Sequence, residues 1–302
     1  MSAPDYKPTL GHRLEFALLW TLFIIVNLVP RFLARAFGWC FGNLLYLLIG
    51  KRRHIAKANL QKHLKLSKGE AGRVANQNFV RFTQNTVDFM RLPHFNARTR
   101  ERWMRMDGLD NLAEAASVGK GIVLATAHTG AWELSAAYFA AHGYPGTALA
   151  TRQHNQLVDD FLNKLRAKAG TEVILVGEGL KPIIRAARAR RIIYILADQN
   201  AGTDGLFLDF LGTPASFHRG PAFFAYKLKL PLVFAFSRRG KNGLLKVWIS
   251  KPYHADPTAD EETEIRRLTT AYAHALESWI RRYPADWYWM HRRWPSHSES
   301  RD

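Results

Sequence analysis

The stretch Gly121-Ile-Val-Leu-Ala-Thr-Ala127, followed directly by His128-Thr-Gly-Ala-Trp-Glu133, indicates how this chain folds. Its first part is a short apolar run that begins at a glycine, which is typical of a β-strand buried on both faces of a parallel sheet. Residues 131–142 favour a helix that ends before Gly143, a residue suited to a helix C-cap. A buried strand that passes into a helix predicts an α/β fold, with His128 at the carboxyl end of the strand.

Segments of the same two kinds alternate along the rest of the chain. Strands are expected at 146–150, 172–176, 192–197, 232–236 and, after a hairpin turn at Lys241-Asn-Gly243, at 244–251. Helices are expected at 54–92 with a break at 67–69, after a turn at 108–110 in a short stretch that ends at Ser117, and at 155–169, 180–190, 221–228 and 261–282. This alternation predicts an α/β protein with a central, largely parallel sheet flanked by helices.

The amino-terminal residues are unusually apolar. Residues 14–29 have only Glu15, Thr21 and Asn27 as polar interruptions, and as a helix they span roughly 24 Å against a hydrocarbon core of about 30 Å. Pro30-Arg31 interrupts the pattern, residues 36–50 are apolar again, and Lys51-Arg-Arg53 closes the segment. We therefore predict a membrane-associating helical leader at 1–53 and an α/β domain at 54–302 that includes an aromatic, basic tail.

How the leader meets the membrane stays open between a tilted span and a helical hairpin in the interface beside anionic headgroups. A cleaved signal peptide would use the small residues of Ala34-Arg-Ala36, but arginines flank that site and apolar sequence resumes after it. A buried core helix is disfavoured because both runs are uniformly apolar.

The charge balance indicates acidic partners. Lysine and arginine number 43 against 25 aspartates and glutamates, a net charge of +18, which favours an anionic membrane, nucleic acid or an acidic protein. The single cysteine, Cys40, excludes an intrachain disulfide framework and fits a reducing compartment. No cysteine and histidine cluster has zinc-binding spacing, so we expect no metal.

Polar side chains follow several of the expected strands. His128 and Glu133 follow the first strand, Arg152 and Asn155 the second, and Asp198-Gln199 the strand at 192–197. Ligands bind outside the carboxyl ends of strands in open α/β sheets, so these groups are expected to converge. A histidine with an orienting carboxylate activates a hydroxyl, and backbone amides around residues 130–132 are expected to stabilise an oxyanion.

Two absences narrow the chemistry further. The chain has no Gly-x-Ser-x-Gly elbow and no glycine-rich phosphate loop. A base without a protein nucleophile is expected to act on a hydroxyl of the substrate itself.

Four blocks in order carry a family resemblance. They are Ala127-His-Thr-Gly-Ala-Trp-Glu133, Leu196-Ala-Asp-Gln199, Leu206-Phe-Leu-Asp-Phe-Leu-Gly-Thr-Pro-Ala215 and Trp287-Tyr-Trp-Met-His-Arg-Arg-Trp294. Their order and spacing resemble the bacterial lipid A biosynthesis (late) acyltransferases, within the lysophospholipid acyltransferase superfamily. Two departures concern substrate identity: Ala197 stands where proline is common, and Arg190-Arg191 stands where a glycine-containing turn is usual.

The resemblance implies acyl transfer from an acyl carrier protein thioester to a hydroxyl of a lipid A precursor or similar phosphoglycolipid. It places the reaction at the cytoplasmic face of the inner membrane, with an anionic membrane as partner and no nucleic acid. It implies no cofactor beyond the carrier's own phosphopantetheine.

The resemblance also suggests roles for individual residues. His128 would be the general base, with Glu133 or Asp198 orienting it, a choice that the sequence leaves open. Arg166, in Leu165-Arg-Ala-Lys-Ala-Gly170, would bind a substrate phosphate or organise the acids, with Arg152 as a second candidate. The neighbouring polar residues Gln199 and Asn155 complete the predicted substrate-binding set. In the tail, His291 and Arg292-Arg293 beside three tryptophans would anchor the chain at the headgroup level.

Two alternatives remain at this level. One is an acyltransferase for another acceptor, such as a lysophospholipid, a mannosylated lipid or a pigment. The other is a non-enzymatic basic protein that coats membranes or binds nucleic acid. The charges are spread through helices rather than gathered in a nucleic-acid motif, which disfavours the second alternative.

Overall fold

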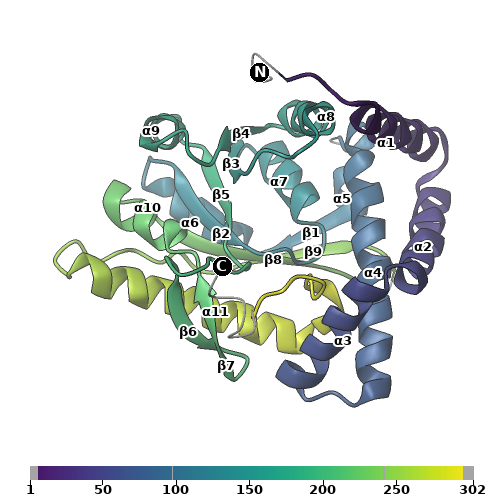
Figure 1. The fold of residues 1–302 in the computed structure, drawn as a ribbon. Helices are drawn as coiled ribbons and strands as arrows, with labels where there is room; N and C mark the ends of the chain where they lie inside the picture. Colours follow the sequence, from purple (N-terminus) through teal and green to yellow (C-terminus); the bar gives the residue numbers. More distant parts are fainter. Residues whose placement is uncertain (1–5, 97, 241, 295–302) are drawn as a thin grey trace.

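A computed structural model describes residues 6–96, 98–240 and 242–294. Its centre is a seven-stranded sheet with the strand order β1-β9-β8-β2-β5-β3-β4 (Figure 1). Neighbouring strands are parallel except β8 and β9, which are antiparallel. This confirms the predicted α/β class and the predicted hairpin, although Lys241 of its turn lies outside the described residues. The strands are β1 (Met104–Asp107), β2 (Ile122–Thr126), β3 (Gly146–Ala150), β4 (Thr171–Leu175), β5 (Ile192–Leu196), β8 (Leu232–Arg239) and β9 (Leu245–Ile249).

Helices cover both faces of this sheet because successive strand residues point to opposite sides. In β2, Ile122 and Leu124 belong to the apolar core on one face, and Val123 and Ala125 to the core on the other. The first core is completed by α6 (Leu109–Ser117), α7 (Trp132–Ala141) and α8 (Gln156–Lys168), the second by α9 (Leu180–Arg188), α10 (Gly220–Leu228) and α11 (Glu261–Arg282).

The amino-terminal third is helical and lies beside the sheet (Figure 1). It comprises α1 (Leu10–Leu28), α2 (Arg31–Leu48), α3 (Gly50–Leu64), α4 (Lys68–Met90), the short 3-10 helix η1 (Leu92–His94) and α5 (Arg100–Trp103). Ser67 caps α4 through a reciprocal pair of hydrogen bonds with Glu70, which explains the predicted break at this point. The predicted domain boundary between residues 53 and 54 falls within α3, and the division into two domains stays a prediction.

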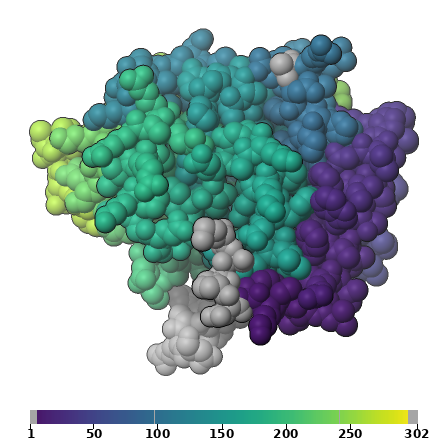
Figure 2. Space-filling view, turned by 90° about the horizontal axis from the view of Figure 1, so that it is seen from above, coloured from purple at the N-terminus to yellow at the C-terminus, as the bar shows by residue number. Residues whose placement is uncertain are grey.

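The helices α1 and α2 expose most of the large apolar side chains on the molecular surface, among them Leu18, Leu28, Phe32 and Leu48 at 70–80% exposure. Within the described residues, α1 is long and apolar enough to cross a membrane, and α2 with α3 passes the same test as a pair bent by 90°. Figure 2 shows this part of the chain along one edge of the molecule.

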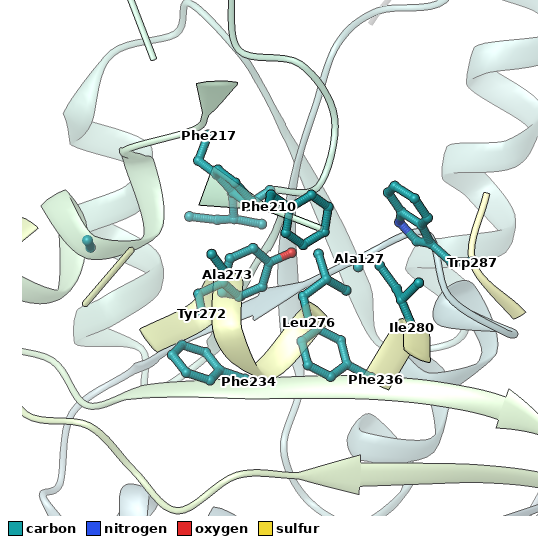
Figure 3. Close-up of a cluster of buried hydrophobic side chains, with 14 of the residues drawn as sticks. Ala127, Phe210, Phe217, Phe234, Phe236, Tyr272, Ala273, Leu276, Ile280 and Trp287 are labelled. Carbon is teal, nitrogen blue, oxygen red and sulfur yellow. The ribbon is translucent and has the colours of Figure 1, made fainter. Parts of the chain in front are cut away.

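The carboxyl-terminal tail folds inward, which corrects the prediction of a headgroup anchor. Trp287, Trp289 and Arg293 are 0–2% exposed. Trp287 borders the apolar cluster that includes Phe210 and Ile280 (Figure 3). The tail after η2 (Pro284–Asp286) returns across the end of the sheet, and Trp287 forms an isolated antiparallel bridge with Thr129. Its aromatic rings fill the core instead of meeting lipid.

Candidate active site

The sheet register brings His128 and Asp198 together. Thr126 at the end of β2 is paired with Leu196 at the end of the parallel neighbour β5. Each strand is followed two residues later by a polar side chain, so His128 and Asp198 leave the sheet at the same edge.

Asp198 binds His128 twice. Its Oδ1 accepts a hydrogen bond from His128 Nδ1 at 2.8 Å, and its Oδ2 accepts one from the His128 backbone N–H at 3.0 Å. Since an ionised carboxylate only accepts, the imidazole proton lies on Nδ1, and the lone pair of Nε2 is the one that can accept a proton. The His128 side chain is 23% exposed, whereas that of Asp198 is 2% exposed.

A second side chain, which the sequence assigned to the membrane surface, also holds Asp198. Trp287 Nε1 donates to Asp198 Oδ2 at 2.8 Å. The tail is joined to the histidine loop as well, because Tyr288 N–H donates to the His128 carbonyl at 3.1 Å. In the sequence, only its place in a block of family resemblance marked Trp287 as a candidate functional residue. Its contact with Asp198 depends on how the tail folds back, which the sequence does not show.

These contacts shift the proton affinities of the pair. Burial by itself lowers the pKa of His128, but the charge and hydrogen bond of Asp198, with a contribution from Glu133, hold it above the ordinary value of 6.5. Burial by itself raises the pKa of Asp198, but His128 and the Trp287 N–H bring it below 3.8. The pair is therefore built to keep the carboxylate ionised beside the imidazole.

The loop after His128 depends on Gly130. Its φ is +51°, a left-handed conformation that favours glycine, and an added Cβ would lie 2.5 Å from the Ser237 carbonyl oxygen. The Gly130 N–H donates to the Asp286 carbonyl at 2.8 Å, and its carbonyl accepts from Asn85 Nδ2 at 2.6 Å. The Gly130 amide is thus already engaged, which corrects its assignment to an oxyanion hole.

Glu133 does not hydrogen-bond His128 in the described structure. It lies in the first turn of α7, where its carboxylate accepts two hydrogen bonds from Arg166 of α8, at 3.0 Å from Nε and 2.5 Å from Nη2. Burial by itself lowers the pKa of Arg166, but the charge of Glu133 raises it above its ordinary value. The geometry therefore answers the question left open by the sequence: Asp198 contacts the imidazole, and Glu133 contacts Arg166.

Of the remaining predicted site residues, Asn155 binds other partners in the described structure. The Asn155 side chain caps α8 and binds the His12 carbonyl at 2.9 Å and Glu15 at 2.8 Å, so it ties α8 to α1. Arg152 is exposed on the loop after β3, and Gln199 is half-buried directly after Asp198. Substrate contacts by Arg152 and Gln199 stay predictions, whereas the buried Asn155 is engaged as a structural residue.

An apolar groove of about 1160 Å³ lies beside the Glu133–Arg166 pair. Its wall includes Ala137, one helical turn after Glu133 on α7, and Leu165, next to Arg166 on α8. Phe16 and Trp20 of α1 close the other side by edge-to-face contacts with Phe161. The groove thus runs between the apolar leader and the α/β domain.

A buried aspartate that orients a partly exposed histidine at a strand end is an arrangement suited to activating a hydroxyl. The family model of bacterial lipid A biosynthesis acyltransferases matches residues 7–296. The chain therefore belongs to this family and is an acyltransferase.

Individual relatives agree with this class. The chain is 29% identical over 226 residues to a phosphatidylinositol mannoside acyltransferase of Mycobacterium tuberculosis, covering 71% of this chain and 68% of the relative. It is 24% identical over 194 residues to a lipid A biosynthesis acyltransferase of Haemophilus influenzae, covering 61% and 56%. Among solved structures, the 1-acyl-sn-glycerophosphate acyltransferase of Thermotoga maritima matches with a TM-score of 0.42 and 13% identity over 82% of this chain and 98% of that one.

Proposed function

We propose that this protein is a membrane-associated acyltransferase that moves a fatty acyl chain from an acyl carrier protein thioester to a hydroxyl of a lipid A precursor or similar phosphoglycolipid. The observation that carries the proposal is the His128–Asp198 pair at the carboxyl ends of β2 and β5. The proposed location is the cytoplasmic side of the inner membrane.

In the proposed reaction, His128 Nε2 accepts the proton of the acceptor hydroxyl as the oxygen attacks the thioester carbonyl. A carbon–oxygen bond forms, the carbon–sulfur bond breaks, and the proton passes from His128 to the departing thiolate. Asp198 orients the ring and stabilises the imidazolium between these two transfers. The ester and the free thiol of the carrier are the products, and no other reactant is needed.

Glu133 and Arg166 have a supporting place in this proposal. Their bidentate pair fixes the first turn of α7 beside the imidazole, where the charge of Glu133 also favours the imidazolium. The backbone N–H groups of Ala131 and Trp132 donate no hydrogen bond within the described residues, and we propose them as the oxyanion donors in place of the engaged amide of Gly130.

The apolar groove between α1, α7 and α8 is the proposed place of the acyl chain. It begins one turn from Glu133 and is walled by aromatic residues of α1, so a chain drawn from the bilayer side could enter it.

Replacing Ala140, which lines the groove, with phenylalanine should shift the preference of the enzyme toward shorter acyl donors. The matched Ala189→Phe change at the exposed end of α9 should leave chain preference unchanged.

Membrane association is proposed from the apolar surface of α1 and α2, and electrostatic attraction from the net charge of +18. Acyl carrier protein and the phosphorylated acceptor are both acidic partners in this proposal. A positively charged protein would attract each of them to the same membrane surface.

The test compares membrane lipids from cells with and without the protein by mass spectrometry. The proposal predicts that the protein adds one fatty acyl group to a phosphorylated glycolipid. Purified protein should use an acyl carrier protein thioester in preference to the same acyl group on coenzyme A. Equal use of both donors would contradict the donor assignment, and unchanged lipids would contradict the acceptor class.

A specific observation favours a second candidate acceptor. The match to a phosphatidylinositol mannoside acyltransferase is higher in identity and in coverage than the match to the Haemophilus influenzae lipid A enzyme. A mannosylated phospholipid is therefore the alternative acceptor. Competition between the two lipids for one labelled acyl donor distinguishes them, since the true acceptor suppresses transfer to the other.

A further inference from the structure

A second, polar pocket of about 270 Å³ lies between α2, α4 and the end of β8. Three arginines line it: Arg35 of α2, Arg81 of α4 and Arg239 of β8. Asn76, Gln77 and Gln84 of α4 contribute amide groups. None of these residues contacts the His128–Asp198 pair in the described structure, so the pocket is separate from the proposed chemistry.

Carboxylates balance two of the three arginines. Arg81 pairs with Asp286, and Arg239 pairs with the fully buried Asp88 at 2.7 Å. Asp88 is shared, because Arg31 also binds it at 3.2 Å. Four arginines, Arg31, Arg35, Arg81 and Arg239, thus lie around two buried carboxylates, Asp88 and Asp286, which leaves an excess of positive charge at the pocket.

Arg35 is the arginine that is not balanced. Within the described residues it takes part in no ion pair, and its buried Nε has no hydrogen-bond partner. The positive charges of Arg239 and Arg31 repel Arg35, and the attraction of Asp88 offsets only part of this repulsion. A buried guanidinium donor without an acceptor is costly, and an anion in the pocket would satisfy it.

The position of the pocket indicates where such an anion comes from. Trp39, one turn after Arg35, lines the pocket and is 55% exposed on the apolar surface of α2. Tryptophan and arginine side by side are typical of the headgroup level of a membrane interface. Arginine forks and amide donors suit the oxygen atoms of phosphate.

We propose that this pocket binds the phosphate group of an anionic membrane lipid, with Arg35 as its principal ligand. Arg81 and Arg239 form the cationic wall and Trp39 lies against the glycerol end of the lipid. The pocket adjoins the histidine loop through Asp286, which binds Arg81 by its side chain and Gly130 N–H by its carbonyl. Binding is independent of acyl transfer, so it can be measured without any donor.

The experiment uses the full chain in a neutral detergent and titrates short-chain phosphatidic acid by isothermal calorimetry. Arg35→Gln should weaken binding by about tenfold or more, since it removes a charge-assisted contact to phosphate. Arg35→Lys keeps the charge without the planar fork and should give a smaller loss. Arg188→Gln, at an exposed position of α9, is the matched control and should bind as the wild type does.

Inorganic phosphate and phosphatidic acid distinguish the source of the ligand. Competition by millimolar phosphate supports a site for free phosphate, and failure to compete supports a site that needs the lipid chain. Wild-type affinity in Arg35→Gln, or no binding of either probe to the wild type, would overturn the proposal. Thermal melting of Arg35→Gln and Arg35→Lys shows whether a loss of binding reflects loss of the fold.

Discussion

Asp198 accepts hydrogen bonds from both the ring and the backbone of His128, at 2.8 Å from Nδ1 and 3.0 Å from the amide nitrogen. The two residues are 70 positions apart in the chain, yet each follows its strand by two residues. The parallel pairing of β2 with β5, in the register Thr126 with Leu196, brings them together. The contact is therefore a consequence of sheet topology.

Replacing Asp198 with asparagine should reduce the rate of acyl transfer by about 10²–10⁴-fold. Asparagine keeps the shape but offers His128 a neutral partner, so the imidazolium that forms in the reaction loses its counter-charge. The measurement is kcat for transfer by the purified protein. A variant within about threefold of the wild type would contradict an orienting role for this carboxylate.

The pH dependence of transfer reports the same pair. Because Asp198 and Glu133 hold the pKa of His128 above 6.5, the free base forms only as pH rises through that higher value. The rate should therefore increase with pH, with a midpoint above 6.5. Asp198→Asn removes the larger stabilisation of the imidazolium and should move the midpoint down.

Glu133→Gln is the comparison for this pH profile. The charge of Glu133 acts on His128 without a hydrogen bond. Removing this charge should therefore lower the midpoint of the pH–rate profile less than Asp198→Asn does. The opposite order would assign the orienting role to Glu133.

Trp287→Phe should keep the apolar packing of the tail and remove the N–H that binds Asp198. Losing a hydrogen bond to a charged group costs about 1.5–3 kcal/mol, which corresponds to roughly tenfold or more in rate if it weakens the pair. The pKa of Asp198 should also rise, because the Trp287 N–H helps to hold it below 3.8. On the acid side, activity should therefore appear only at a higher pH than in the wild type. Trp289→Phe is the matched control, because its Nε1 binds the Pro284 carbonyl and not the site.

Much of the fold could be predicted from the sequence, because apolar runs of strand length alternate with amphipathic helices. The strand at 122–126 and the helix after it are bounded by residues that signal their ends, such as Gly121 and Gly143. The short strand β1 and the antiparallel pair β6 (Leu206–Phe210) and β7 (Thr213–Phe217) were missed. In β1, methionines alternate with charged residues over only four positions, which is too short to stand out as a strand. Residues 206–215, which contain β6 and the start of β7, were interpreted only as a block of family resemblance.

The candidate site was predictable only in its components. His128 and Asp198 stand at strand ends that the apolar pattern locates, but their pairing needs the order of the strands, which no local pattern contains. The tail was interpreted as a membrane anchor because tryptophan and arginine are common there, whereas Trp287 is buried against the core. Asn155 was predicted as a substrate-binding residue because a polar side chain after a strand is typical of a site, whereas the structure shows it capping α8 and binding α1.

Gly130→Ala should destabilise the protein and reduce activity together. Alanine would have to adopt φ +51° and would meet the Ser237 carbonyl at 2.5 Å, a cost of about 1–3 kcal/mol from backbone strain before any shift of the loop. Gly143→Ala is the matched control, because its φ is +87° but nothing lies within 4 Å of the added Cβ. It should lose about 1–2 kcal/mol of stability and keep its specific activity. Equal specific activity in both variants would show that the loop does not depend on Gly130.

The most direct test of the central claim compares the rates of acyl transfer by purified His128→Ala and the wild type. Both proteins are used at the same concentration, after circular dichroism has shown that both are folded. If His128 takes the proton of the acceptor hydroxyl, the variant should lose at least about 100-fold in kcat while it still binds membranes. Transfer at close to the wild-type rate would contradict the account, because the His128–Asp198 pair would then have no part in the reaction.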